Sequence, residues 1–150
     1  MTATNWPTIQ IAAALIVDSA GRALLVRKRG TQTFMQAGGK IEPHESPAQA
    51  LVREIEEELG IRIAPDGMEY LGAFTAQAAN ETDYIVKAEA FYIRADMAVF
   101  PAREIEEIVW IMPGDDSLPL APLTRDHLLP IARHLTTKTS TSSNLKDIYK

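Results

Sequence analysis

Apolar and polar positions along the chain follow two kinds of pattern, one typical of strands and one of helices. A nearly continuous apolar run at residues 8–17 predicts a strand that is buried on both faces. Turn residues at 18–21 lead to a second strand at 22–28, and we interpret the two strands as a hairpin. Further strands are expected at residues 68–77, 84–93 and 108–112, the last after a polar loop at residues 101–107.

Helical spacing of apolar residues appears at residues 47–59. Ser46 and Gln49 have the spacing of a capping box, and Gly60 supplies a C-terminal stop. The predicted apolar face consists of Ala48, Leu51, Val52, Ile55 and Leu59.

A second helix is expected near the end of the chain. It would start at a Thr124 cap and run to about Leu135, with a kink at Pro130. Residues 136–150 are rich in Ser and Thr, so we expect a mobile tail after one domain of residues 1–135. The order of strands, helix, strands and helix favours an α+β fold with a mixed sheet between helices.

Composition narrows the class of protein. A chain of 150 residues with 46% hydrophobic content can bury one core, and a net charge of −5 disfavours general nucleic-acid binding. The absence of cysteine excludes disulfides and thiolate chemistry. The N-terminus lacks the features of a signal peptide, and the longest apolar run is too short to span a bilayer. We therefore expect a cytoplasmic monomer or homodimer that binds neither nucleic acid nor membrane.

Three carboxylates on the helix at residues 47–59 have an unfavourable arrangement. Glu54, Glu57 and Glu58 stand at i, i+3 and i+4, where a like-charge pair costs roughly 0.2–0.5 kcal/mol. They also lie in the C-terminal half of the helix, where the helix dipole disfavours anions. A hard divalent cation would turn these side chains into ligands. The alternative is a solvated acidic face that serves only solubility.

Glycine and basic residues precede this helix. Gly38 and Gly39 allow a tight backbone path and expose a carbonyl that a metal ion could use. Strand alternation places Arg27 and Arg29 on one face, where they could clamp phosphate oxygens or form no more than a charged strand end. Lys40 could neutralise a phosphate or lie in solvent.

The glycines and the acidic helix belong to one longer series with fixed spacing. Its members are Gly39, Glu45, Arg53, Glu54, Ile55, Glu57, Glu58, Gly60 and Ile61. This series resembles the signature of the Nudix hydrolases, with every specified position present. The resemblance is tight over residues 38–61 and looser over residues 8–135, and it implies an α/β/α sandwich.

The resemblance also implies roles for individual residues. The ligands of Mg²⁺, or alternatively Mn²⁺, would be the Gly38 carbonyl and the carboxylates of Glu54, Glu57 and Glu58. Structural support would come from Gly39, Glu45 and Arg53. Phosphate oxygens would contact Arg27, Arg29 and Lys40. The base that takes the proton of the attacking water would be Glu57 or Glu54, or an acid before the last strand, where Glu104 is favoured over Glu107.

The activity implied by the resemblance is metal-dependent hydrolysis of a nucleoside triphosphate (NTP or dNTP) to a nucleoside monophosphate and pyrophosphate, a reaction suited to sanitation of the nucleotide pool. Hydrolysis of ADP-ribose or another nucleoside diphosphate derivative is the alternative, and a nucleotide-sensing module without activity is a third. Relatives that remove oxidised guanine nucleotides read the base with an Asn near the last helix, and residues 120–125 contain none. Four aromatic residues could line a base pocket or belong to the core: Phe74, Tyr84, Phe91 and Tyr92.

Overall fold

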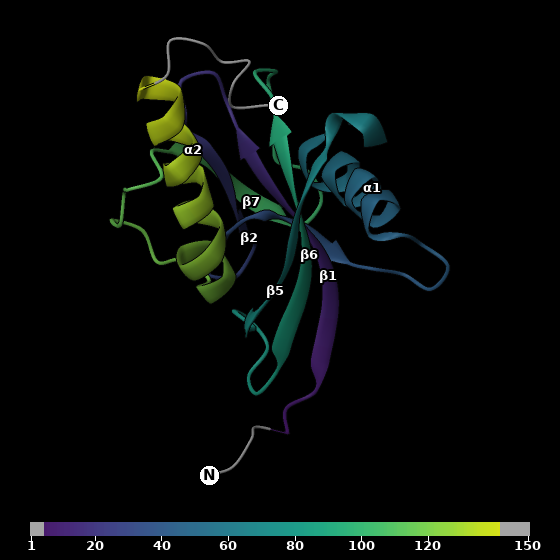
Figure 1. The fold of residues 1–150 in the computed structure, drawn as a ribbon. Helices are drawn as coiled ribbons and strands as arrows, with labels where there is room; N and C mark the ends of the chain where they lie inside the picture. The colour runs from purple at the N-terminus through teal and green to yellow at the C-terminus, as the bar shows by residue number, and fades with distance from the viewer. Residues whose placement is uncertain (1–4, 142–150) are drawn as a thin grey trace.

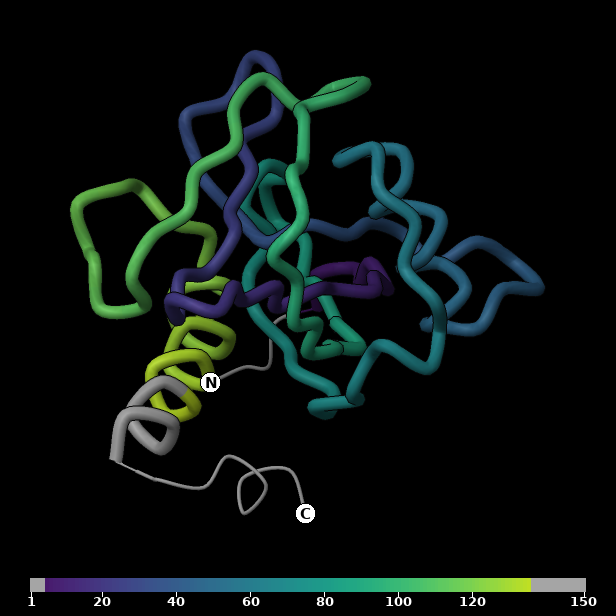
Figure 2. The backbone as a smooth tube through the Cα atoms, turned by 90° about the horizontal axis from the view of Figure 1, so that it is seen from above, coloured from purple at the N-terminus to yellow at the C-terminus, as the bar shows by residue number. Residues whose placement is uncertain are grey.

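A mixed β-sheet lies between helices on its two faces. The structure, a computed structural model, describes residues 5–141. Within these residues seven strands form one sheet, with helix α1 (Pro47–Leu59) on one face and helix α2 (Leu129–Thr141) on the other (Figure 1). The view from above in Figure 2 places the same two helices on opposite sides of the strands. The α/β/α layering expected from the sequence is confirmed.

Strand β1 (Thr8–Val17) is central to the sheet. It runs parallel to β6 from the pair Thr8–Ile85 to the pair Val17–Arg94, and antiparallel to β4. The remaining pairs, β1–β2, β5–β6, β2–β3 and β2–β7, are antiparallel. The other strands are β2 (Ala23–Lys28), β3 (Phe34–Met35), β4 (Ala37–Lys40), β5 (Glu69–Gln77), β6 (Ile85–Arg94) and β7 (Ile105–Ile111).

The predicted hairpin between β1 and β2 is much shorter than expected. Its turn is closed by backbone hydrogen bonds from the Asp18 amide to the Arg22 carbonyl and from the Gly21 amide to the Asp18 carbonyl, but the pairing of the two strands is limited to Val17 and Ala23. The edge of β1 that would continue the hairpin is instead occupied by β4, which pairs with residues 11–14. The longer pairing of strand β2 is therefore with β7.

The prediction that residues 101–107 form a loop is wrong at its end, because β7 begins at Ile105. Ile105 is buried, whereas Glu106 and Glu107 are exposed on the strand. These two acids pair with Arg29 and Arg27 of the neighbouring chain segment. Charge pairing across the strands lets an acidic segment adopt extended structure, a contact that the local sequence does not reveal.

Each face of the sheet has its own apolar core. Alternating residues of β1 point to opposite faces, so Ala12 and Ala14 pack under α1 while Ala13 packs under α2. On the α1 side the helix contributes Leu51, Ile55 and Leu59, among other residues. The α2 side includes Leu128, Leu129 and Ala132. The small side chains of β1 bring both helices close to the centre of the sheet.

Helix α1 has the ends that the sequence predicts. Ser46 accepts a hydrogen bond from the Gln49 amide, the Gln49 side chain accepts one from the Ser46 amide, and Gly60 ends the helix in the left-handed conformation. The reciprocal cap satisfies two of the amides that a helix N-terminus leaves without partners.

The last helix differs from its prediction at both ends. Thr124 is not its cap, since the Thr124 hydroxyl bonds to Gln36, and residues Thr124–Leu128 form a π-helical turn before α2. This turn precedes Pro130, whose missing amide disturbs the regular hydrogen-bond pattern. Helix α2 continues to Thr141, beyond the expected end at Leu135. The tail prediction for residues 142–150 lies outside the described residues.

Candidate active site

The glycine pair lies at the centre of the site and is held against strand β1. Gly38 has φ = 136°, and a Cβ atom there would lie 2.1 Å from the Ala12 carbonyl oxygen. A side chain at this position is therefore excluded both by backbone conformation and by contact. This close approach allows β4 to carry the Gly38 amide to the C-terminal half of α1.

Gly39 makes room for a carboxylate. A Cβ atom at Gly39 would lie 2.5 Å from the carboxyl carbon of Glu54 and 2.7 and 2.8 Å from its oxygens. The backbone conformation of Gly39 is not left-handed. The glycine is therefore needed for the space that the Glu54 carboxylate occupies, and not for its backbone angles.

Glu58 is buried with one hydrogen bond to its carboxylate. Its side chain is 2% exposed, and one oxygen accepts a hydrogen bond of 3.0 Å from the Gly38 amide. Burial raises the pKa of Glu58 to about 8; the Gly38 amide opposes this shift, and the nearby Glu54 charge adds to it. A buried carboxylate without a cationic partner in direct contact suits a site that receives a cation.

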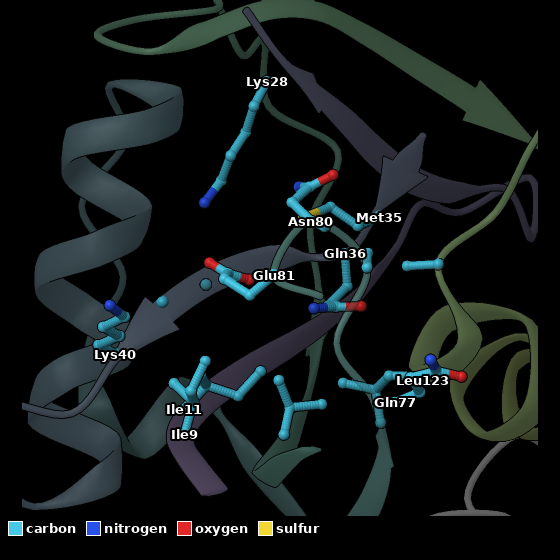
Figure 3. Close-up of a pocket in the computed structure, with 15 residues that line it drawn as sticks. Ile9, Ile11, Lys28, Met35, Gln36, Lys40, Gln77, Asn80, Glu81 and Leu123 are labelled. Carbon is cyan, nitrogen blue, oxygen red and sulfur yellow. The ribbon is translucent and has the colours of Figure 1, made fainter. Parts of the chain in front are cut away.

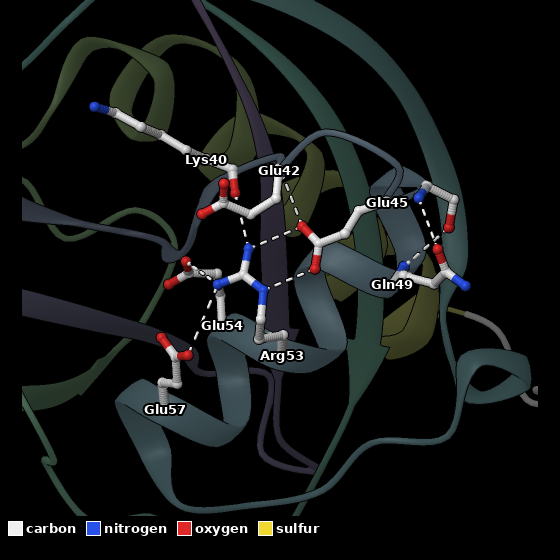
Figure 4. Close-up of polar contacts among 8 residues, drawn as sticks. Lys40, Glu42, Glu45, Gln49, Arg53, Glu54 and Glu57 are labelled. Carbon is white, nitrogen blue, oxygen red and sulfur yellow. Dashed lines mark hydrogen bonds and ion pairs between the residues drawn. The ribbon is translucent and has the colours of Figure 1, made fainter.

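Arg53 links the loop before α1 to the acids on the helix (Figure 4). Its guanidinium forms hydrogen bonds of 2.7 and 2.9 Å with Glu45, 2.9 Å with Glu54 and 3.1 Å with the Lys40 carbonyl. The hydrogen bond from Arg53 lowers the pKa of Glu45 to about 2. The pKa of Glu54 is raised by burial, with Arg53 opposing the shift. Arg53 and Glu45 thus form the pair that the resemblance implied.

Glu57 is the most exposed of the three helix acids, at 41%, and lies 3.8 Å from Arg53. In the part of the chain that the structure describes, no three acidic or histidine side chains converge closely enough to hold a metal ion. Glu54 and Glu58 do lie at the glycine turn, and Gly39 leaves the space that the Glu54 carboxylate fills. The oxygen donors therefore fit a hard divalent ion once Glu57 turns towards them; their assignment as ligands stays a prediction.

Glu104 and Lys28 complete the surroundings of the acids. The segment before β7 is tied to the end of α1 by a hydrogen bond from the Ala102 amide to the Glu58 carbonyl. Glu104 lies 3.8 Å from the Lys28 ammonium, and both side chains are close enough to affect the pKa of Glu58. Glu104 is therefore placed near the helix acids, and its role as a base stays a prediction.

Of the three basic residues at positions 27–29, Lys28 faces the acids of α1, whereas the two predicted arginines do not. Arg27 bonds to Glu107 and to the Thr31 carbonyl, and Arg29 pairs with Glu106. Alternation along the strand turns Lys28 to the opposite face, which is the one that faces α1. Phosphate contacts by Arg27 and Arg29 stay predictions, and the sequence analysis overlooked Lys28 although its position between them contained the signal.

An open pocket lies beside the glycine turn (Figure 3). Its lining includes Gly38, Gly39, Lys28, Lys40 and the buried Gln36. Most of the remaining lining is apolar, with polar residues from the turn between β5 and β6: Ile9, Ile11, Met35, Gln77, Ala79, Asn80, Glu81, Val86, Ala121 and Leu123. Two lysines beside the glycine turn, together with a largely apolar lining, suit a ligand with an anionic part and a flat apolar part.

The four aromatic residues proposed from the sequence do not line this pocket. Phe91 and Tyr92 are buried in the two cores, and Phe74 packs on the α2 side, where its ring stacks on that of His127. Tyr84 is exposed. Of the two interpretations of these residues, the structure favours packing over base binding.

Comparison with known proteins agrees with the fold. The family model described as "NUDIX domain" matches residues 7–129. The chain is 34% identical over 122 residues to the CTP pyrophosphohydrolase of Escherichia coli K12, covering 76% of this chain and 84% of that protein. It is 44% identical over 57 residues to the 8-oxo-dGTP diphosphatase of Haemophilus influenzae, covering 35% of this chain and 42% of the relative.

Among solved structures, the E. coli ORF135 protein is similar with a TM-score of 0.65 and 28% identity, covering 96% of this chain and all of that one. An α/β/α sandwich with an acidic helix against a glycine turn defines the class, and the family match then settles the assignment: the chain belongs to the Nudix family. It is therefore a hydrolase that acts on phosphoric anhydride bonds. No helix within residues 5–141 is long and apolar enough to cross a membrane.

Proposed function

We propose that this protein hydrolyses a nucleoside triphosphate, NTP or dNTP, to the nucleoside monophosphate and pyrophosphate, with Mg²⁺ as the metal ion and Mn²⁺ as a substitute. The observation that carries the proposal is the pocket, whose lining combines the glycine turn and two lysines with an apolar surface. The similarity to the CTP pyrophosphohydrolase, over most of both chains, supports the same substrate class.

Each part of the site would have a task in this reaction. Glu54, Glu57 and Glu58 would hold the divalent ion, together with the Gly38 carbonyl. When bound, the ion lowers the pKa of the attacking water and neutralises phosphate oxygens. Lys28 and Lys40 line the pocket near the glycine turn and would neutralise the remaining phosphate charge.

The reaction balances with one water molecule. Its oxygen forms a bond to phosphorus, the bond from that phosphorus to the oxygen bridging the α- and β-phosphates breaks, and the bridging oxygen leaves with the other phosphate. A carboxylate accepts the proton of the water. We assign this step to Glu104, which lies beside Lys28 and near Glu58, with Glu57 and Glu54 as the alternatives.

The test is a substrate panel. The four NTPs, the four dNTPs and ADP-ribose would be incubated with the protein in Mg²⁺ or Mn²⁺, and the products separated by ion-exchange chromatography. We expect pyrophosphate and a monophosphate from at least one triphosphate. Faster turnover of ADP-ribose would replace the triphosphate proposal, and absence of turnover for every compound would favour a module that only binds nucleotides.

Two variants of α1 separate metal chemistry from a general effect of charge. Glu57→Gln removes a proposed ligand and should abolish Mg²⁺-dependent turnover while the circular dichroism spectrum stays the same. Glu56→Gln is the matched control, because Glu56 pairs with the exposed Arg62 on another part of the helix. Equal activity of the two variants would contradict the role proposed for the acidic cluster.

A further inference from the structure

A buried polar pair at the deep end of the pocket links two distant parts of the chain. Gln36, between β3 and β4, is 8% exposed, and Thr124, at the start of the π-helical turn, is 0% exposed. The Thr124 hydroxyl oxygen accepts a hydrogen bond of 3.2 Å from the Gln36 backbone amide and lies 2.6 Å from the side-chain oxygen of Gln36. Nothing in the metal site or the phosphate contacts requires this pair.

These contacts fix the orientation of the Gln36 carboxamide. The Thr124 hydroxyl has a single hydrogen to donate. Its oxygen already accepts a hydrogen bond from the Gln36 backbone amide. The distance of 2.6 Å suits an O–H···O hydrogen bond, whereas an N–H···O bond is typically longer. Thr124 therefore donates to the Gln36 Oε1 atom, and the Nε2 atom takes the opposite side.

The Gln36 Nε2 atom faces the pocket. Among the described side chains it has no hydrogen-bond partner, and no side-chain nitrogen or oxygen of this part of the chain is both fully buried and unpaired. The Nε2 atom must therefore be accessible, and Gln36 lines the pocket. In Figure 3 the nitrogen lies on the side of Ile11, and the oxygen on the side nearer Leu123. The pocket thus receives a fixed N–H donor within an apolar surface.

A glutamine that can use both ends of its amide pairs well with adenine, which offers a donor and an acceptor side by side. Gln36 cannot present both ends of its amide to a base in the pocket, because its oxygen is turned towards the buried Thr124 hydroxyl and only its nitrogen faces the pocket. A ring carbonyl, present in cytosine, uracil, thymine and guanine but absent from adenine, needs only a donor.

We propose that Gln36 is a specificity-determining residue that donates a hydrogen bond to a carbonyl oxygen of the base, and that Thr124 is the positioning residue that holds it as a donor. The enzyme would then favour nucleotides whose base carries a carbonyl group over adenine nucleotides. This inference rests on the proposed function, since it specifies the base of the proposed nucleotide substrate.

The wild-type protein already provides a test. The kcat/KM values of CTP, UTP, GTP and ATP would be compared in Mg²⁺, together with equilibrium binding of the corresponding α,β-methylene analogues, which cannot release pyrophosphate. We expect ATP to be poorer than the best of the other three by about tenfold or more in both measurements, because adenine has no carbonyl oxygen and carries an amino donor where guanine has one, so the Gln36 donor would lose its acceptor at that position.

Three variants test the roles of the pair. Gln36→Met keeps the length of the side chain but removes the donor, and should reduce the preference over ATP roughly 5- to 20-fold. Thr124→Val keeps the shape of the side chain but leaves the Gln36 carboxamide free to turn. It should therefore raise kcat/KM for ATP relative to kcat/KM for the nucleotides with carbonyl bases. Thr124→Ser retains the hydroxyl and should preserve the wild-type order of bases, which a purely structural role of the residue would not require.

The outcomes separate this inference from the proposed function. Release of pyrophosphate from all four triphosphates at similar rates, or an unchanged order of bases in Gln36→Met and Thr124→Val, would overturn the base-reading role and leave the proposed function standing. Preferential binding of the analogues with carbonyl bases without any hydrolysis would support the role of Gln36 and overturn the activity. ATP as the best substrate and the tightest ligand would overturn the inference.

Discussion

Adjacent glycines in the site have different physical roles. Gly38 is required by a left-handed backbone and by contact with the backbone of β1, whereas Gly39 is required only by the carboxylate of Glu54. The first constraint concerns folding, because backbone atoms cannot move aside. The second constraint concerns the site, because the carboxylate at the end of the flexible Glu54 side chain can move aside.

Gly39→Ala should therefore separate activity from stability. The new methyl group displaces the Glu54 carboxylate, so we expect a large loss of kcat with a change in unfolding free energy of only about 1 kcal/mol or less. Steady-state kinetics and urea denaturation would measure the two effects. Gly67→Ala, with open space around the new Cβ atom, is the control, and unaltered kcat in Gly39→Ala would contradict the role of the glycine.

Glu58 gives a pH dependence of stability in the metal-free protein. Its folded-state pKa of about 8 lies above the ordinary value of 4.5, so the native state binds the proton more tightly than the unfolded state. Its contribution is fully present below pH 4.5 and is lost as the pH rises through about 8, with a size on the order of a few kcal/mol.

Urea denaturation in EDTA at pH 5 and pH 8 would measure this effect. Glu58→Gln cannot ionise, so the loss of stability between the two pH values should be smaller in the variant than in the wild type. Other titrating groups are common to both proteins and cancel in the comparison. An identical pH dependence of the two proteins would show that Glu58 is not held in an environment that disfavours its charge.

Single residues were the least predictable part of the site. The spacing of the glycines and acids was visible in the sequence, because these residues are local to one loop and one helix. Lys28 was overlooked because the choice between the faces of its strand depends on which side α1 covers. Thr124 was predicted to be a helix cap, since its partner Gln36 is 88 positions away in sequence.

Helix α1 was the most predictable element, and its bounds and capping box are as expected. Caps and amphipathic spacing are local properties. Strand β7 was predicted less well, because Glu106 and Glu107 become part of a strand only through the arginines opposite them. The π-helical turn before Pro130 was not predicted, although the proline was expected to disturb the helix.

The pair of Arg53 and Glu45, which joins helix α1 to the loop before it, can be tested by mutation. Arg53 holds the loop at residues 40–45 on α1 through a two-pronged contact and a bond to the Lys40 carbonyl. Arg53→Lys keeps the charge but loses the fork geometry. We expect kcat/KM to fall by about 10- to 100-fold, as for other residues that support metal ligands.

The control for Arg53→Lys is Arg62→Lys. Arg62 also pairs with a glutamate, Glu56, but its side chain is 81% exposed. Kinetics at several Mg²⁺ concentrations would distinguish weaker metal binding, which more Mg²⁺ repairs, from a misplaced loop, which it does not. Equal effects of the two substitutions would contradict a special role for Arg53.

For the whole molecule, the α+β class and the order of the longer strands and the two helices were predictable from periodicity. The short strands β3 and β4 and the pairing of the strands were not. Sequence neighbours suggested a β1–β2 hairpin, whereas β1 pairs along most of its length with β6 and β4. Strands β2 and β4 both could pair with the same edge of β1. The packed structure gives most of this edge to β4, which brings the glycine turn to α1. Local turn signals carry no information about that competition.

Divalent ions should stabilise the whole fold. The acids of α1 repel one another without a cation, so an ion bound to the native state at ten times its Kd would contribute about 1.4 kcal/mol. For a chain of this size the melting temperature should rise by roughly 3–6 °C. Differential scanning fluorimetry with MgCl₂ would measure the shift, with NaCl of equal ionic strength as the control. The absence of a shift, or an equal shift in Glu57→Gln, would contradict metal binding at these acids.

The run Ala12-Ala13-Ala14 sets limits on how this protein can change. All three side chains are completely buried, and the Ala12 carbonyl lies where any side chain on Gly38 would have to go. In a random mutant library these positions should hardly vary. A larger residue would push α1 or α2 away from the sheet and would displace the glycine turn that packs on β1. Variation should accumulate instead at the far rim, at Asn80 and Glu81, so that new substrate preferences can be selected there without loss of the catalytic frame.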